Sequence, residues 1–129
     1  MSASLSGTTH SPGLKKLGLA ATASLAVLIA VLALIPMPNT GPPGSDKAHH
    51  ALAFAALAFP LSAVGYRPVA LVLLGAIAYG GLIEVLQPLV GRSAEWADFH
   101  ADILGAIFGV GLGLGIGSIF RRRQNRTSE

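Results

Sequence analysis

Residues 105–117 read GAIFGVGLGLGIG, an uncharged stretch in which glycine returns at every fourth position. Positions four apart share one face of an α-helix. The glycines therefore form two rows, one of Gly105, Gly109, Gly113 and Gly117 and another of Gly111 and Gly115. Small residues at this spacing let a second helix approach closely in lipid. The stretch predicts a membrane helix that packs against a neighbour along the first row.

The rest of the chain is equally apolar. Of its 129 residues, 52% are hydrophobic and 12% are charged, against about 25% charged in a typical soluble domain. A helix needs about 20 apolar residues to cross a bilayer. Four segments meet this length with few or no ionisable residues: 17–35, 48–66, 69–90 and 99–120. We therefore predict an all-α polytopic membrane protein, a bundle of four transmembrane helices.

Charge and loop composition predict how this bundle is organised. Residues 1–13 are expected to form a disordered leader, 14–120 the four-helix membrane domain, and 121–129 a basic tail. Seven of the nine basic residues fall on one side of the predicted membrane, and cytoplasmic loops are the ones enriched in Lys and Arg. We expect a multi-pass protein of the cell (inner or plasma) membrane with both termini cytoplasmic, and its first segment retained rather than cleaved as a signal peptide.

Composition also excludes several classes of site. The chain has no cysteine, which rules out disulfides, thiolate metal sites and cysteine nucleophiles. Its net charge is +3, but the basic residues cluster at helix ends rather than along one exposed face. We therefore expect no nucleic-acid partner.

The ionisable residues within the membrane domain are concentrated near the predicted outer face. They are Asp46, Lys47, His49, His50, Glu84, Arg92, Glu95, Asp98, His100 and Asp102. Residues three or four apart share a helix face, which groups Asp46 with His49 and His50, Glu84 with Gln87, and Asp98 with Asp102. Adjacent histidines diverge by about 100°, so we expect only one of His49 and His50 to face the interior. The distribution predicts a polar site that opens at the outer leaflet.

Glu84 is the acidic residue placed deepest in this pattern. It precedes Val90 by six positions, which puts it about 9 Å below the end of its helix. Pro88 has no N–H to donate to the Glu84 carbonyl. Ionisable residues at membrane depth are costly and usually functional. We therefore expect Glu84 to serve the site rather than the fold.

The ordered set of motifs resembles the VanZ-like family of small bacterial membrane proteins, named for a protein associated with teicoplanin resistance. The resemblance covers residues 46–113. It rests on Asp46, Lys47 and His50; Tyr79, Gly80, Glu84 and Gln87; Gly91 and Arg92; and Asp98, Asp102, Gly105 and Gly109. It implies a membrane location and a shared site formed by Asp46, Lys47, His50, Glu84, Gln87, Arg92, Asp98 and Asp102, more than it implies an activity.

Three functions remain open from the sequence. The first is binding of an anionic envelope lipid or lipid-linked cell-wall precursor, with Lys47 and Arg92 on the phosphate and Glu84, Asp98 and Asp102 completing the network. The second is a membrane-embedded enzyme acting on a phosphate-containing lipid, and the third is a structural or accessory subunit. The sequence assigns no catalytic residue, predicts no cofactor, and does not predict the oligomeric state. We expect no metal, for which His50, Glu84 and Asp102 would be the candidates.

Each site residue also has a simpler interpretation. Lys47 and Arg92 could anchor the protein at the membrane interface by snorkelling, and Asp98 could cap the last helix. Asp46 is expected to cap the second helix. Tyr79, Trp96 and Phe99 are expected to form an aromatic belt.

Overall fold

The computed structural model describes residues 12–36, 41–66 and 68–127, and within them all regular structure is helical. The elements are α1 (Pro12–Leu34), α2 (Ser45–Ala63), α3 (Val69–Leu86), the short 3₁₀ helix η1 (Gln87–Val90) and α4 (Trp96–Thr127). The predicted all-α bundle is confirmed. α4 continues through most of the segment predicted as a basic tail, and residues 1–11 of the predicted leader lie outside the described residues.

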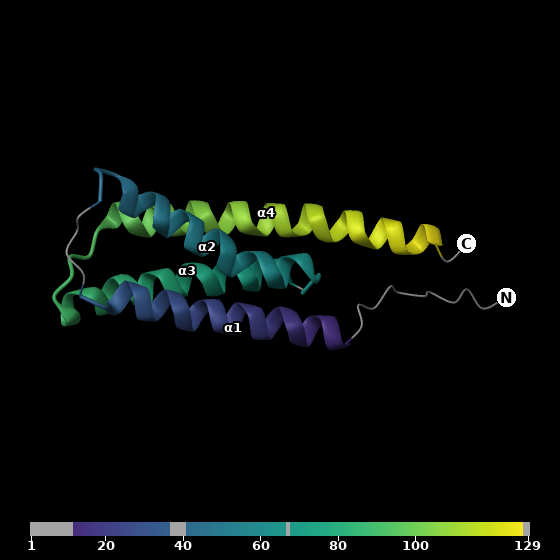
Figure 1. Ribbon diagram of the computed structural model, residues 1–129, viewed down its shortest axis with the longest axis horizontal. Helices are drawn as coiled ribbons and strands as arrows, with labels where there is room; N and C mark the ends of the chain where they lie inside the picture. The colour runs from purple at the N-terminus through teal and green to yellow at the C-terminus, as the bar shows by residue number, and fades with distance from the viewer. Residues whose placement is uncertain (1–11, 37–40, 67, 128–129) are drawn as a thin grey trace.

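The helices run along one long axis, with α2 inclined against α4 (Figure 1). α1 begins and α4 ends at one end of the bundle, whereas the connections from α1 to α2 and from α3 to α4 lie at the other. Lys15 and Lys16 of α1 and the Arg121–Arg123 run of α4 therefore share one end of the molecule. We call the opposite end the connection end.

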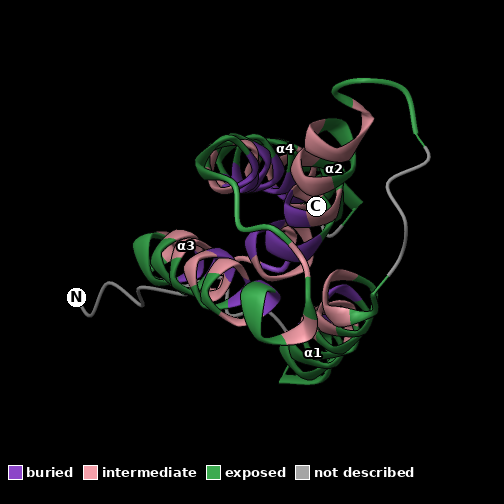
Figure 2. Ribbon diagram, turned by 90° about the vertical axis from the view of Figure 1, so that its left-hand side faces the viewer, coloured by how far each residue is buried: buried purple, intermediate pink, exposed green. Residues whose placement is uncertain are grey.

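Among the described residues, three helical segments are long and apolar enough to cross a membrane: α1, α3 together with η1, and α4. α2 is not among them, because its first two turns carry Asp46, Lys47, His49 and His50. Its later residues are instead the centre of the bundle, where Phe54, Leu57 and Ala58 are buried. Figure 2 shows the buried residues on the facing sides of the four helices and the exposed ones outside. The apolar outer surface indicates a membrane protein.

The glycine row of α4 is the contact with α2. A Cβ atom on Gly105 or Gly109 would overlap the backbone carbonyl of Ala51 or Ala55, respectively. Further along the row, a Cβ on Gly113 would lie 2.7 Å from the Phe59 carbonyl oxygen. Gly111 and Gly115 of the second row have open space around them. The predicted assignment of the two rows is confirmed.

Local backbone chemistry explains where α2 begins and α3 ends. Gly44, with φ of 84°, is the residue that precedes α2, and it provides no side-chain cap. Asp46 lies inside the first turn, so the prediction that it caps the helix is wrong; glycine alone readily adopts the left-handed backbone that this start requires. α3 changes to the 3₁₀ form at Gln87, next to Pro88, which lacks the N–H that an α-helix would need there.

The aromatic belt prediction is wrong for Tyr79. Its hydroxyl donates a 2.5 Å hydrogen bond to the Ala26 carbonyl of α1, and its ring packs at 6.1 Å from that of Phe54. Tyr79 therefore ties α3 to α1 inside the bundle. Trp96, by contrast, is 80% exposed and packs edge-on against Phe99.

Candidate functional site

A cluster of four ionisable side chains lies at the connection end, between α2, α3 and α4. Its members are His50, Glu84, Asp98 and Asp102, and we call it the His50 cluster. His50 Nδ1 lies 2.9 Å from Asp102 Oδ1, and Nε2 lies 3.9 Å from Asp98 Oδ2. Because Asp98 and Asp102 are one turn apart on α4, the imidazole of α2 lies between their carboxylates.

Glu84 brings α3 into the cluster. Its Oε2 atom accepts a 2.9 Å hydrogen bond from the backbone N–H of Glu95. One ligand atom each from His50, Glu84 and Asp102 lies within 4.8 Å of the others. Gly80, one turn before Glu84, makes this approach possible, since a Cβ there would lie 2.9 Å from Asp102 Oδ2. The three helices therefore converge on one small polar volume.

Several oxygens at this end of the bundle are buried without a hydrogen-bond partner among the described residues. They are Glu84 Oε1, Gln87 Oε1, Asp98 Oδ1 and Asp102 Oδ2. Asp98 and Asp102 are themselves only 3% and 0% exposed. Most buried polar groups in proteins are hydrogen-bonded. Several unpartnered acceptor oxygens together therefore indicate a site that can take a cation or a hydrogen-bond donor.

Lys47 covers the cluster from the first turn of α2. Its Nζ lies 3.2 Å from Glu95 Oε2 and 3.5 Å from Asp98 Oδ1. The hydrogen bond to Glu95, aided by the charge of Asp98, raises the pKa of the Lys47 ammonium above its ordinary value. The side chain is 43% exposed, and exposed ion pairs contribute little stability. Lys47 is thus charged and free to exchange partners.

Arg92 holds the end of α1. Its Nη1 donates to the carbonyls of Ala33 at 3.0 Å and Leu32 at 3.3 Å, which are among the carbonyls that a helix leaves unpaired in its last turn. A cation is also favoured at a helix C-terminus. Gln87 Nε2 reaches the same Ala33 carbonyl at 3.5 Å. Arg92 therefore holds the end of α1 and also borders the cavity described next.

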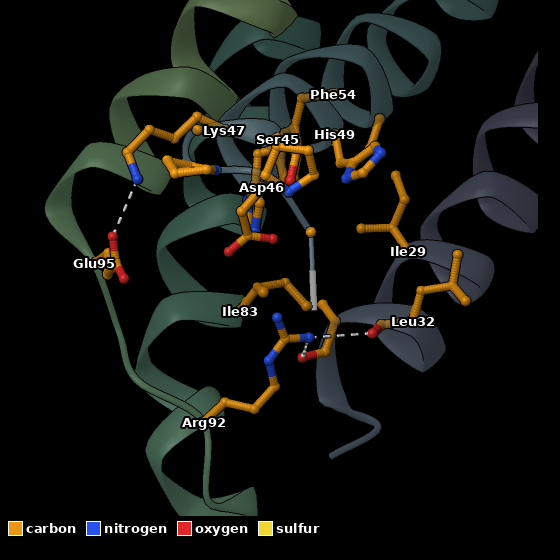
Figure 3. A pocket seen from close by; sticks show the side chains of 17 residues that line it. Ile29, Leu32, Ser45, Asp46, Lys47, His49, Phe54, Ile83, Arg92 and Glu95 are labelled. Carbon is orange, nitrogen blue, oxygen red and sulfur yellow. Dashed lines mark hydrogen bonds and ion pairs between the residues drawn. The ribbon is translucent and has the colours of Figure 1, made fainter. Parts of the chain in front are cut away.

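A pocket of about 740 Å³ opens beside the His50 cluster, between the end of α1 and the start of α2. We call it the end pocket, and Figure 3 shows its lining. The polar lining consists of Ser45, Asp46, Lys47, His49, His50, Arg92 and Glu95. The apolar wall is formed by Ile29, Leu32, Ala33, Ala53, Phe54 and Ile83, and residues 41–44 complete the rim. His50 belongs to both the pocket and the cluster.

The predicted site residues thus fall into three groups. His50, Glu84, Asp98 and Asp102 form one cluster; Asp46, Lys47 and Arg92 line the end pocket; and Gln87 turns toward α1. His50 points inward and His49 is exposed on the pocket side. Only one of the two adjacent histidines therefore faces the interior, as predicted, and it is the one in the VanZ-like motif. Asp98 is buried in the first turn of α4 and is engaged with Lys47 and His50 rather than acting as the helix cap.

Two features of the connection end were not predicted from the sequence as parts of the site. Glu95 links Lys47 to Glu84, but it lies in a connection, where helix-face arguments do not apply. The α1 wall of the end pocket is apolar and looks like any other lipid-facing helix, so no signal marked it.

Comparisons with protein-family models, curated proteins and solved structures returned no match for this chain. The VanZ-like resemblance therefore stays a prediction that rests on its motifs.

Proposed function

We propose that the chain is a VanZ-like integral membrane protein whose end pocket binds the phosphate-bearing headgroup of an anionic envelope lipid or lipid-linked cell-wall precursor. The observation that carries this proposal is the composition of the pocket. One cavity combines an apolar wall with a rim that holds Lys47 and Arg92. An amphiphile with an anionic head has the same two halves.

The depth of the pocket supports a lipid rather than a small soluble anion. Its lining on α2 extends from Ser45 to Phe54, a stretch of ten residues whose ends lie about 13 Å apart along the helix. The α1 wall adds Ile29 and Leu32 at the same level. A soluble phosphate would use the rim alone and leave this apolar wall without a partner, whereas an acyl chain would cover it at a gain of about 25 cal/mol per Å².

The rim offers donors for the phosphate. Arg92 uses Nη1 on the end of α1, and a guanidinium has five N–H donors in a fork that suits phosphate. The other two guanidinium nitrogens of Arg92, Nε and Nη2, make no hydrogen bond to the described residues. The Lys47 ammonium is exposed enough to move from Glu95 to a bound headgroup.

We further propose that the end pocket opens on the outer face of the cell membrane, with both termini cytoplasmic. The basic residues Lys15, Lys16 and Arg121–Arg123 lie at the end opposite the pocket, and positive charge is usually enriched on the cytoplasmic side of a membrane protein. The chain has no cysteine, so single cysteines report cleanly. In intact cells, Ser93→Cys should react with a membrane-impermeant maleimide, and Thr127→Cys, which is exposed beyond the basic residues at the end of α4, should not; the reverse pattern would place the pocket inside.

The lipid itself is tested by titrating detergent-purified protein with phosphatidylglycerol and observing the complex by native mass spectrometry. Arg92→Gln should weaken binding about ten- to hundredfold, because a hydrogen bond to a charged group is worth about 1.5–3 kcal/mol. Glutamine keeps an amide donor for the Ala33 carbonyl, and a thermal melt checks that the bundle is intact. Arg122→Gln removes the same charge from the other end and should bind like the parent. Equal weakening by both variants would mean that the lipid is attracted by net charge and does not occupy the end pocket.

A second candidate function is supported by the His50–Asp102 pair, since an imidazole oriented by a carboxylate is a common general acid or base. The same titration distinguishes the two functions. An enzyme would convert the phosphate-containing lipid to a product of lower mass over time, whereas a binding protein would release it unchanged.

A further inference from the structure

Two carboxylates of the His50 cluster are buried with one oxygen unpartnered. Asp102 is fully buried, and its Oδ2 has no hydrogen-bond partner among the described residues. Glu84 Oε1 is buried and unpartnered in the same way. Carboxylates are removed from water at high cost unless they are paired or coordinate a metal. The fold brings two such groups to one imidazole and leaves part of each unpaired.

The charges nearby do not balance. Four carboxylates surround His50: those of Asp46, Glu84, Asp98 and Asp102. Within the described part of the chain, the other cation in ion-pair contact with the cluster is Lys47, which reaches Asp98 and is shared with Glu95. Neither Glu84 nor Asp102 has a basic partner other than His50 there. An added positive charge would therefore be stabilised at Glu84 and Asp102.

The donor atoms have the arrangement of a metal site. His50, Glu84 and Asp102 each offer one ligand atom within 4.8 Å of the others. His50 Nδ1 and Asp102 Oδ1 are 2.9 Å apart, slightly less than the roughly 3.4 Å that separates two ligands of a tetrahedral ion with bonds near 2.1 Å. An ion would thus take the place of the proton that these two atoms share, with a small outward shift of each.

The second nitrogen of the His50 imidazole, Nε2, also faces a carboxylate. His50 Nε2 faces Asp98 Oδ2 at 3.9 Å, and metal-bound histidines usually donate their other N–H to a carboxylate. One imidazole nitrogen with two carboxylates suits zinc and similar transition metals, whereas magnesium and calcium prefer oxygen ligands alone. Three protein ligands leave a coordination position open. His50 also lines the end pocket, which gives an ion a path to the cluster.

We propose, in place of the expectation from the sequence that no metal is bound, that His50, Glu84 and Asp102 bind one divalent transition-metal ion, of which zinc is the representative. This site does not depend on lipid binding, because its ligands come from the helices themselves. A failure of the lipid proposal would leave it intact, and its failure would leave the pocket rim intact.

The test uses the full chain, purified in detergent without added lipid through a tag that contains no histidine. Protein stripped with a chelator is incubated with Zn²⁺, passed over a desalting column, and analysed for zinc by elemental mass spectrometry and for thermal stability. The parent should retain about one ion per chain and melt at a higher temperature with zinc, since a ligand that binds only the folded state stabilises it. His50→Gln and Asp102→Asn should lose both effects.

His49→Gln is the matched control, because it removes the neighbouring, exposed imidazole on the pocket side and should leave both effects intact. Glu84→Gln, a change at a half-buried position, serves if Asp102→Asn does not fold, and it should reduce zinc retention. The proposal is overturned if the parent retains no zinc above buffer, if His50→Gln retains as much as the parent, or if His49→Gln alone abolishes binding.

Discussion

Replacing Gly109 with leucine is expected to remove the folded protein from the membrane. A Cβ atom at this position would overlap the Ala55 carbonyl of α2, which is backbone and cannot rotate away as a side chain would. Overpacking costs about 1–3 kcal/mol where side chains can adjust, and here α2 and α4 would have to separate along the glycine row. We expect a loss of at least about 3 kcal/mol, enough to exhaust much of a small domain's stability.

Gly111→Leu is the control for this prediction. Gly111 lies two positions further along α4, faces outward and has open space around it. Leucine there keeps the lipid-facing surface apolar and improves helix propensity. The amount of protein in the membrane fraction and its melting temperature in detergent should match the parent for Gly111→Leu and collapse for Gly109→Leu. Similar behaviour of the two variants would refute the assignment of the contact row.

Periodic features of the sequence predicted the fold well. The glycine row could be assigned because a spacing of four positions fixes a helix face. Asp98 and Asp102 extend the same face of α4 toward the start of the helix. The same geometry predicted that only one of His49 and His50 faces inward, and the VanZ-like motif selected His50. Inferences about which residues share a helix face depend only on the geometry of that helix. The packing of the other helices therefore did not change them.

Features that depend on how distant segments meet could not be read in this way. The intramolecular partners of Lys47 and Arg92 are an example: Lys47 pairs with Glu95, and Arg92 donates to the last carbonyls of α1. Those partners are set by the path of the connections, which no periodicity encodes. The apolar wall of the end pocket was missed for a related reason: Ile29 and Leu32 look the same in sequence whether they face lipid or a cavity.

A photoreactive phospholipid should label the inside of the bundle if the end pocket holds a lipid. Phe54 is only 1% exposed yet lines the pocket, so bulk membrane lipid does not reach it easily. Leu112 of α4 is 47% exposed and reports the surrounding lipid. A phosphatidylglycerol analogue with its diazirine in the upper acyl chain should label the two sites differently. Labelling near Phe54 should saturate at low lipid concentration, and labelling near Leu112 should rise in proportion to it.

The most direct measurement is therefore the peptide map of these cross-links in reconstituted protein, with and without excess unlabelled phosphatidylglycerol. The account predicts a saturable adduct on the peptides that contain Ile29 and Phe54, lost on competition and lost in Arg92→Gln. Adducts that are confined to Leu112 and other outward residues, or labelling near Phe54 that survives both competition and Arg92→Gln, would contradict lipid binding in the end pocket.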